Sequence, residues 1–233
     1  CSIAMADGSD ASRQISQVVL LDSDFTSLPQ VVMEGRKAIH HVTRTAGVFF
    51  IKTVYSVLLS LFCLLAGREF PFIPIQITLV DACIEAYPSF FTILESNTSR
   101  IRGRFLTEAL SHAAPFGAAV AAAVALLMLW APFSPQERGT VMYLLLILIS
   151  MAAVVKSCLP FTALRAFLCV TMGLGIAAAC VLLPGLFGVA GISGEMAVCL
   201  LVSAAVSAAL IALLERAESR LSEIRHLDGK RLL

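Results

Sequence analysis

The chain has 233 residues, of which 58% are hydrophobic and 14% are charged, and its formal net charge is +1. Its mean hydropathy of +0.88 separates it from soluble proteins, in which about 25% of residues are charged. The composition indicates a membrane protein, and the lack of a concentrated basic patch in the sequence excludes nucleic acid as a partner.

Residues 1–27 differ in character from the rest of the chain. Short apolar runs at residues 1–6 and 18–21 flank a turn-rich segment and a short polar segment, which predicts a strand, a loop, a short helix and a second strand. So short a segment cannot bury a core of its own. We therefore expect it to be the C-terminal edge of an α/β domain, and the chain to be the C-terminal portion of a longer protein.

A helix is predicted over residues 28–46, with Pro29 in its first turn, and no break signal separates it from the first apolar stretch. Six stretches approach the roughly 20 residues that a membrane span requires. They are residues 47–66, 72–94, 113–131, 140–159, 164–185 and 194–214. The predicted fold class is mainly α: a six-helix transmembrane bundle over residues 47–214, preceded by the small α/β edge and followed by a cytoplasmic tail, 215–233.

Lysine and arginine are distributed unevenly around these spans. If the N-terminal segment is cytoplasmic, then of the 17 residues only Arg68 and Arg138 lie on the far side, and Lys52 lies within a span. The fourteen cytoplasmic residues are Arg13, Arg36, Lys37, Arg44, Arg100, Arg102, Arg104, Lys156, Arg165, Arg216, Arg220, Arg225, Lys230 and Arg231. Because positive residues are retained inside, we expect a multi-pass protein of the cell membrane with both termini in the cytoplasm.

The second span carries two acids near its middle, Asp81 and Glu85, four residues apart. On an α-helix this spacing places both on one face, a single turn apart. Pro88 cannot donate a hydrogen bond to the carbonyl of Ile84, so a carbonyl oxygen becomes available between the two acids. Three oxygen donors at membrane depth predict half of a site for a hard cation such as Ca²⁺ or Mg²⁺. The alternative is a structural role, with one carboxyl protonated and hydrogen-bonded inside the bundle.

Three segments near the N-terminus resemble one protein family in order and spacing. They are Ser2-Ile-Ala-Met-Ala-Asp-Gly-Ser-Asp-Ala11, Val18-Val-Leu-Leu-Asp-Ser-Asp-Phe-Thr-Ser-Leu28 and Glu34-Gly-Arg-Lys-Ala-Ile39. They resemble the end of the HAD-like phosphorylation domain of P-type cation-transporting ATPases and the stalk that follows it. The segment from Ile73 to Pro88 resembles the sixth transmembrane helix of the calcium-pump branch. Residues 1–105, including Lys52-Thr-Val-Tyr-Ser56 and Tyr87-Pro-Ser-Phe-Phe91, more narrowly resemble the bacterial cation-transporting ATPase E.

The resemblance implies that the six spans are helices five to ten of such a pump, and that Asp81 and Glu85 occupy ion-ligand positions. It also implies supporting roles for Tyr55, Thr78 and Pro88. The complete protein would use ATP and Mg²⁺ and transport a cation, with Ca²⁺ suggested by the family branch. Its phosphorylated aspartate, nucleotide site and first four helices would lie before Cys1, so the chain would need that N-terminal part and the lipid bilayer as partners and would be inactive alone.

The fifth helix departs from the calcium-pump pattern. Val54 and Val57 stand where those pumps place an amide and a carboxylate, which indicates one ion per cycle. Lys52 lies nearby and is predicted to be an internal counter-charge for Asp81 and Glu85 when the site is empty. Alternatively, its side chain extends to the cytoplasmic interface.

Two other functions are compatible with the sequence. Asp81 and Glu85 could relay protons or ions in a secondary transporter or channel, the N-terminal match then being accidental. The chain could also be a non-catalytic membrane subunit if it is translated alone. The gene upstream of Cys1 distinguishes these, because a pump requires an aspartyl-phosphate motif there.

The charge asymmetry makes a prediction about topology. Ser134→Cys, introduced into a background without the native cysteines, should react with a membrane-impermeant thiol reagent from the far side, because Ser134 lies in the same connection as Arg138. Labelling from the cytoplasmic side only would contradict the predicted orientation.

Overall fold

The computed structural model describes residues 2–92 and 105–231, without the side chains of Thr92, Glu108 and residues 221–231. Several predictions therefore lie outside the described residues: those for Arg100, Arg102 and Arg104, the end of the second span at residues 93–94, and the last two residues of the tail. The chain divides into two compact units, one with residues up to His40 and one from His41 onward. Each is described by itself.

The first unit contains the predicted strand, loop, helix and strand. Strand β1 (Ile3–Met5) pairs in parallel with β2 (Val18–Leu20), with Ile3 opposite Val18. Helix α1 (Asp10–Ile15) connects them and is capped by the hydroxyl of Ser9, which accepts a hydrogen bond from the backbone N–H of Ser12. A 3₁₀ turn, η1 (Phe25–Ser27), leads into α2. The sheet has only these two strands among the described residues.

Helix α2 (Leu28–Ala66) is a single unbroken helix of 39 residues. It includes both the residues predicted to form the stalk and those predicted to form the first span. Its buried residues, Val48, Ile51, Tyr55, Leu59 and Cys63, recur every three or four positions. This spacing places them on one face, which packs into the second unit.

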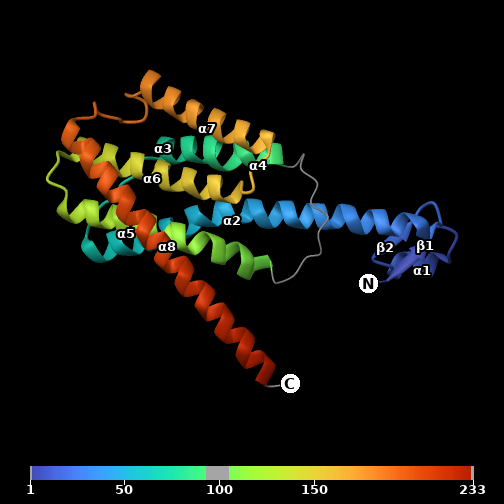
Figure 1. The fold of residues 1–233 in the computed structure, drawn as a ribbon. Coiled ribbons are helices and arrows are strands. Elements are labelled where there is room, and N and C mark those ends of the chain that lie inside the picture. The colour runs from blue at the N-terminus through green and yellow to red at the C-terminus, as the bar shows by residue number, and fades with distance from the viewer. Residues whose placement is uncertain (1, 93–104, 232–233) are drawn as a thin grey trace. The chain divides into compact units, whose positions relative to one another are not determined.

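The remaining helices of the second unit are shown in Figure 1. They are α3 (Pro74–Val80), the π-helix η2 (Asp81–Ala86), α4 (Tyr87–Thr92), α5 (Phe105–Trp130), α6 (Pro135–Ser157), α7 (Ala163–Leu182) and α8 (Gly194–Arg231). By length and composition, five helices of the described chain could cross a membrane: α2, α5, α6, α7 and α8. The predicted second span instead consists of the three short segments α3, η2 and α4.

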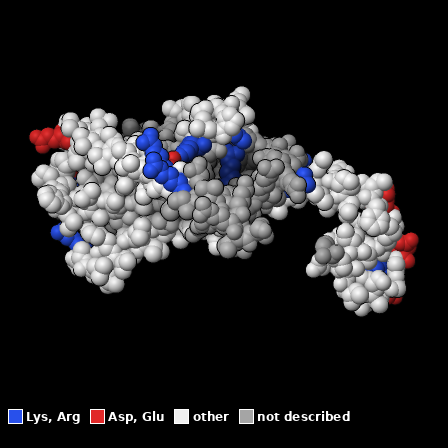
Figure 2. Space-filling model, turned by 60° about the horizontal axis from the view of Figure 1, so that its bottom comes forward, with Lys and Arg blue, Asp and Glu red and all other residues white. Residues whose placement is uncertain are grey.

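Helices α5, α6 and α8 pack against one another, and the segments α3, η2 and α4 pack against α6 and α7. The core between them is apolar and includes Tyr143, Leu145 and Leu146, none of which is exposed. Many large apolar side chains remain on the outside, such as Leu65 and Leu182, and Figure 2 shows wide uncharged areas on this unit. Such a surface is suited to lipid rather than to water.

Candidate functional site

The residues predicted to bind an ion lie on the continuous helical stretch α3–η2–α4, which we call the site helix. It begins with Pro74 in the first helical turn, a favoured position because proline lacks an N–H group. In its middle the hydrogen-bond pattern changes, and the N–H of Tyr87 donates to the carbonyl of Ala82, five residues back. Pro88 follows and cannot supply the α-helical bond to Ile84. Single π turns of this kind occur frequently at functional sites, and here the turn contains both acids.

A lysine from α2 meets the two carboxylates. The Lys52 Nζ atom donates a hydrogen bond of 2.8 Å to Asp81 Oδ2 and lies 4.0 Å from Glu85 Oε2. The Glu85 side chain is 5% exposed, whereas those of Asp81 and Lys52 are 34% and 30% exposed. Glu85 is therefore the deeper acid, and Lys52 reaches it past Asp81.

Three buried oxygen atoms in this region have no hydrogen-bond partner among the described residues: Tyr55 Oη, Asp81 Oδ1 and Glu85 Oε2. Tyr55 lies three residues after Lys52 on α2, is 1% exposed, and is near enough to both acids to be affected by their charge. An unsatisfied buried polar group costs about 1–3 kcal/mol. Satisfying these oxygen atoms would require partners other than the described residues.

The charge and the atom types of these groups indicate which kind of ligand would suit them. Two carboxylates and one ammonium give a local charge of −1 when all three are ionised, which attracts a cation. Carboxylate, carbonyl and hydroxyl oxygens are the ligands of hard cations such as Ca²⁺ and Mg²⁺. No group of three or more His, Cys, Asp or Glu side chains that could hold a metal occurs within the described residues. A divalent cation here would therefore need further oxygen ligands.

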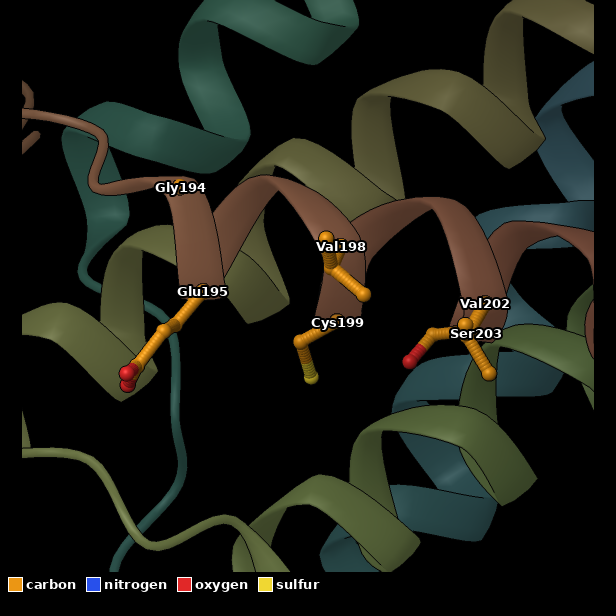
Figure 3. Close-up of a pocket in the computed structure, with 6 residues that line it drawn as sticks. All are labelled: Gly194, Glu195, Val198, Cys199, Val202 and Ser203. Atoms are coloured by element: carbon orange, nitrogen blue, oxygen red, sulfur yellow. The ribbon is translucent and has the colours of Figure 1, made fainter.

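A groove lies along α8 and differs from this arrangement. Figure 3 shows the groove, of about 470 Å³, lined by Gly194, Glu195, Val198, Cys199, Val202 and Ser203. All of these residues come from one helix, and Glu195 is the single charged side chain in the lining. The groove thus lacks the convergence of charged groups from separate helices that marks the site around Lys52.

Comparison with known proteins identifies the family. The probable cation-transporting ATPase exp7 of Streptococcus pneumoniae is 38% identical over 181 residues, which are 73% of this chain and 23% of that protein. The calcium-transporting ATPase CtpE of Mycobacterium bovis is 36% identical over 164 residues, 64% of this chain and 21% of that protein. CtpE of Mycolicibacterium smegmatis is 37% identical over 131 residues, 52% and 17% of the two chains. These matches support a fragment of a P-type cation-transporting ATPase.

These matches confirm the resemblance inferred from the sequence motifs. The chain spans about a fifth of the length of these cation-transporting ATPases. No family model matches it.

Several of the predicted site residues lie together. Lys52 of α2 meets Asp81 and Glu85, and the backbone of Ile84 lies between the two acids in the π turn, with its side chain fully buried. Tyr55 is buried one turn after Lys52. Pro88 is buried one turn after Glu85. Whether these groups bind an ion, and whether Lys52 acts as a counter-charge in the transport cycle, remain predictions.

Thr78 and the two valines of α2 are exposed or make other contacts. Thr78 is exposed, and its hydroxyl donates to the carbonyl of Pro74 at 3.0 Å. Val57 is 61% exposed. Val54 packs on α5, because a Cβ atom added at Gly117 would lie 2.6 Å from the Val54 Cβ.

The sequence reasoning did not single out Gln76, a buried amide on the site helix that is 6% exposed. Its partners, Tyr143 and the carbonyl of Phe187, are 67 and 111 residues away. The feature that could have identified Gln76 is a polar amide inside an apolar span. Such a group usually has a hydrogen-bond partner on another helix.

The contact between Lys52 and the acids predicts an energetic coupling that does not depend on transport. Lys52→Met should lower the free energy of unfolding by roughly 1–3 kcal/mol, because two carboxylates are left without their cation. Adding Asp81→Asn should recover part of this loss. Chemical unfolding of the purified protein in detergent measures both effects.

Lys37→Met is the matched control, since Lys37 pairs at 2.6 Å with the exposed Glu34 on the same helix. An exposed pair contributes only about 0–1 kcal/mol. Strictly additive effects of Lys52→Met and Asp81→Asn would contradict the coupling.

Proposed function

We propose that this chain is the membrane part of an ATP-driven pump that moves a hard divalent cation across the cell membrane. Half of the cation site would be on the site helix, with Asp81, Glu85 and the carbonyl of Ile84 as ligands. The observation that carries the proposal is the set of buried oxygen atoms on Asp81, Glu85 and Tyr55 without hydrogen-bond partners. Ca²⁺ is the best candidate, because the CtpE relatives are named calcium-transporting ATPases.

ATP hydrolysis, with its Mg²⁺, is assigned to parts of the complete protein beyond this chain, and the chain alone is expected to be inactive. The relatives are four to five times longer than the stretch they share with it, which agrees with such a division. Both termini of the chain would be cytoplasmic. The remaining ligands of the cation would come from other helices or from water.

Lys52 would be the internal counter-charge of the empty site. Its hydrogen bond to Asp81 compensates one carboxylate without any bound metal. A divalent cation between Asp81 and Glu85 would change the local charge from −1 to +1, and an ammonium about 4 Å away would be strongly repelled. Cation binding is therefore expected to displace Lys52 from Asp81, which links occupancy of the site to the position of α2.

Glu85→Gln and Asp81→Asn should each abolish cation-dependent phosphorylation from ATP in the complete pump, while the protein still folds. A hard divalent cation exchanges its water for anionic oxygen, and each amide removes one charge at nearly constant shape. The measurement is phosphoenzyme formation from labelled ATP as a function of Ca²⁺, Mg²⁺ or Mn²⁺ concentration.

Glu195→Gln and Thr78→Val are the controls. The first neutralises an acid of α8 outside the site, and the second changes an exposed residue of the site helix. Both should retain normal cation dependence. Unchanged cation affinity in both Glu85→Gln and Asp81→Asn would refute the site.

Phosphorylation of the complete pump should saturate with a Hill coefficient near one for the transported cation. Val54 and Val57 offer no oxygen to a second site, and their side chains pack on α5 or lie on the surface. Cooperativity requires at least two linked sites. A clearly sigmoidal cation dependence would show that a second site exists elsewhere.

A further inference from the structure

Gln76 uses both ends of its side-chain amide at the start of the site helix. Its Oε1 accepts a hydrogen bond of 3.2 Å from the backbone N–H of Ile73, and its Nε2 donates one of 2.8 Å to the carbonyl of Phe187. The side chain is buried, and Phe187 is 5% exposed. These two bonds define the orientation of the buried amide. In the opposite orientation its NH₂ group would face the N–H of Ile73, and its oxygen would face the carbonyl of Phe187.

Phe187 belongs to the connection between α7 and α8, residues 183–193. This connection is held in a defined conformation by hydrogen bonds of its own. The N–H groups of Phe187 and Val189 donate to the carbonyls of Leu183 and Pro184 within it. In addition, the backbone N–H of Ala190 donates to the Thr140 hydroxyl of α6 at 2.9 Å. Gln76 therefore attaches the site helix to an ordered support.

Tyr143 of α6 adds a further contact to the same residue. Its hydroxyl donates to the backbone carbonyl of Gln76 at 3.2 Å, and its side chain is fully buried. At the other end of the site helix, the hydroxyl groups of Tyr87 and Thr171 of α7 lie 2.9 Å apart. The π turn with Asp81 and Glu85 thus lies between two hydrogen-bonded ends, both attached to α6, α7 or their connections.

We propose that Gln76 is a positioning residue for the cation site: it fixes the first half of the site helix to α6 and the α7–α8 connection. This inference rests on the proposed function. Asp81 is five residues beyond Gln76 and Glu85 nine, which corresponds to about 7.5 and 13.5 Å of helix. Rotation or sliding of α3 would therefore move the Asp81 carboxylate away from Glu85, and cation affinity would fall even though no ligand had been removed.

The test compares two variants in the complete pump. Gln76→Leu keeps the size of the side chain but removes both amide bonds, whereas Thr140→Val releases the α7–α8 connection at Ala190 without touching the site helix. Gln76→Leu should raise the cation concentration for half-maximal phosphorylation about tenfold, the factor that corresponds to a lost buried hydrogen bond. The maximal level of phosphorylation should be retained. Thr140→Val should change the half-maximal concentration by less than about twofold at a comparable loss of thermal stability.

Two further variants keep the result interpretable. Tyr143→Phe removes only the hydroxyl that donates to Gln76 and should raise the half-maximal concentration in the same direction, which gives a reading if Gln76→Leu fails to fold. Gln76→Glu keeps the acceptor for Ile73 but loses the donor to Phe187 and should also weaken cation binding.

The results distinguish a failure of the role proposed for Gln76 from a failure of the cation site itself. If Asp81→Asn abolishes cation-dependent phosphorylation and Gln76→Leu and Tyr143→Phe leave the half-maximal concentration unchanged, Gln76 is only structural and the inference is overturned. The same holds if Thr140→Val shifts that concentration as much as Gln76→Leu. If neither Asp81→Asn nor Glu85→Gln has an effect, the proposed function fails and the inference fails with it.

Discussion

The ion pair between Lys52 and Asp81 is the interaction on which the arrangement of the second unit depends. An ammonium and a carboxylate in contact attract each other by roughly 4 kcal/mol at a protein-like dielectric, before the cost of desolvation is subtracted. The pair connects α2 to the site helix at a depth where an isolated charge would be costly. Glu85 lies 4.0 Å from the same ammonium without a hydrogen bond to it. One lysine thus partly compensates two acids, and the carboxylate oxygen atoms left over are the ones available to a ligand.

The site helix departs from regular α geometry where it carries the two acids. A regular α-helix would place Asp81 and Glu85 one turn apart and satisfy each backbone carbonyl with an N–H group four residues later. Pro88 removes one such donor, and the segment Asp81–Ala86 adopts the π pattern instead. The deviation is confined to one turn because Gln76 and Tyr87 attach the flanking segments to neighbouring elements. The π turn that carries both acids is thus flanked by two segments that are hydrogen-bonded to neighbouring elements.

The sequence predicted the long helices and the charged residues that meet between them. It did not predict contacts between residues far apart in the chain, for physical reasons. Hydropathy located five long helices, because each is apolar over about 20 residues. Two acids, a lysine and a proline in apolar stretches indicated the site, because buried charges need partners. The extent of the π segment, Asp81–Ala86, could not be predicted, since the sequence indicated only the carbonyl that Pro88 leaves free. Gln76 and Phe187 are separated by 111 residues, and no local pattern connects an amide to the carbonyl of a distant turn.

The contacts of α2 suggest which partner of the ion pair can move. Asp81 and Glu85 are carried by a helix whose two ends are hydrogen-bonded to α6, α7 and their connections. Lys52 is carried by α2, which meets α5 at small residues: Gly47 lies against Ala109, and Val54 against Gly117. Small residues let helix backbones approach closely, and the Val54 side chain occupies the space above Gly117. A displacement of α2 along α5 would separate Lys52 from Asp81 at the cost of this packing. The carboxylates would stay in place, and the charge that faces them would change, which is the change that a cation site needs in order to bind and release its ion.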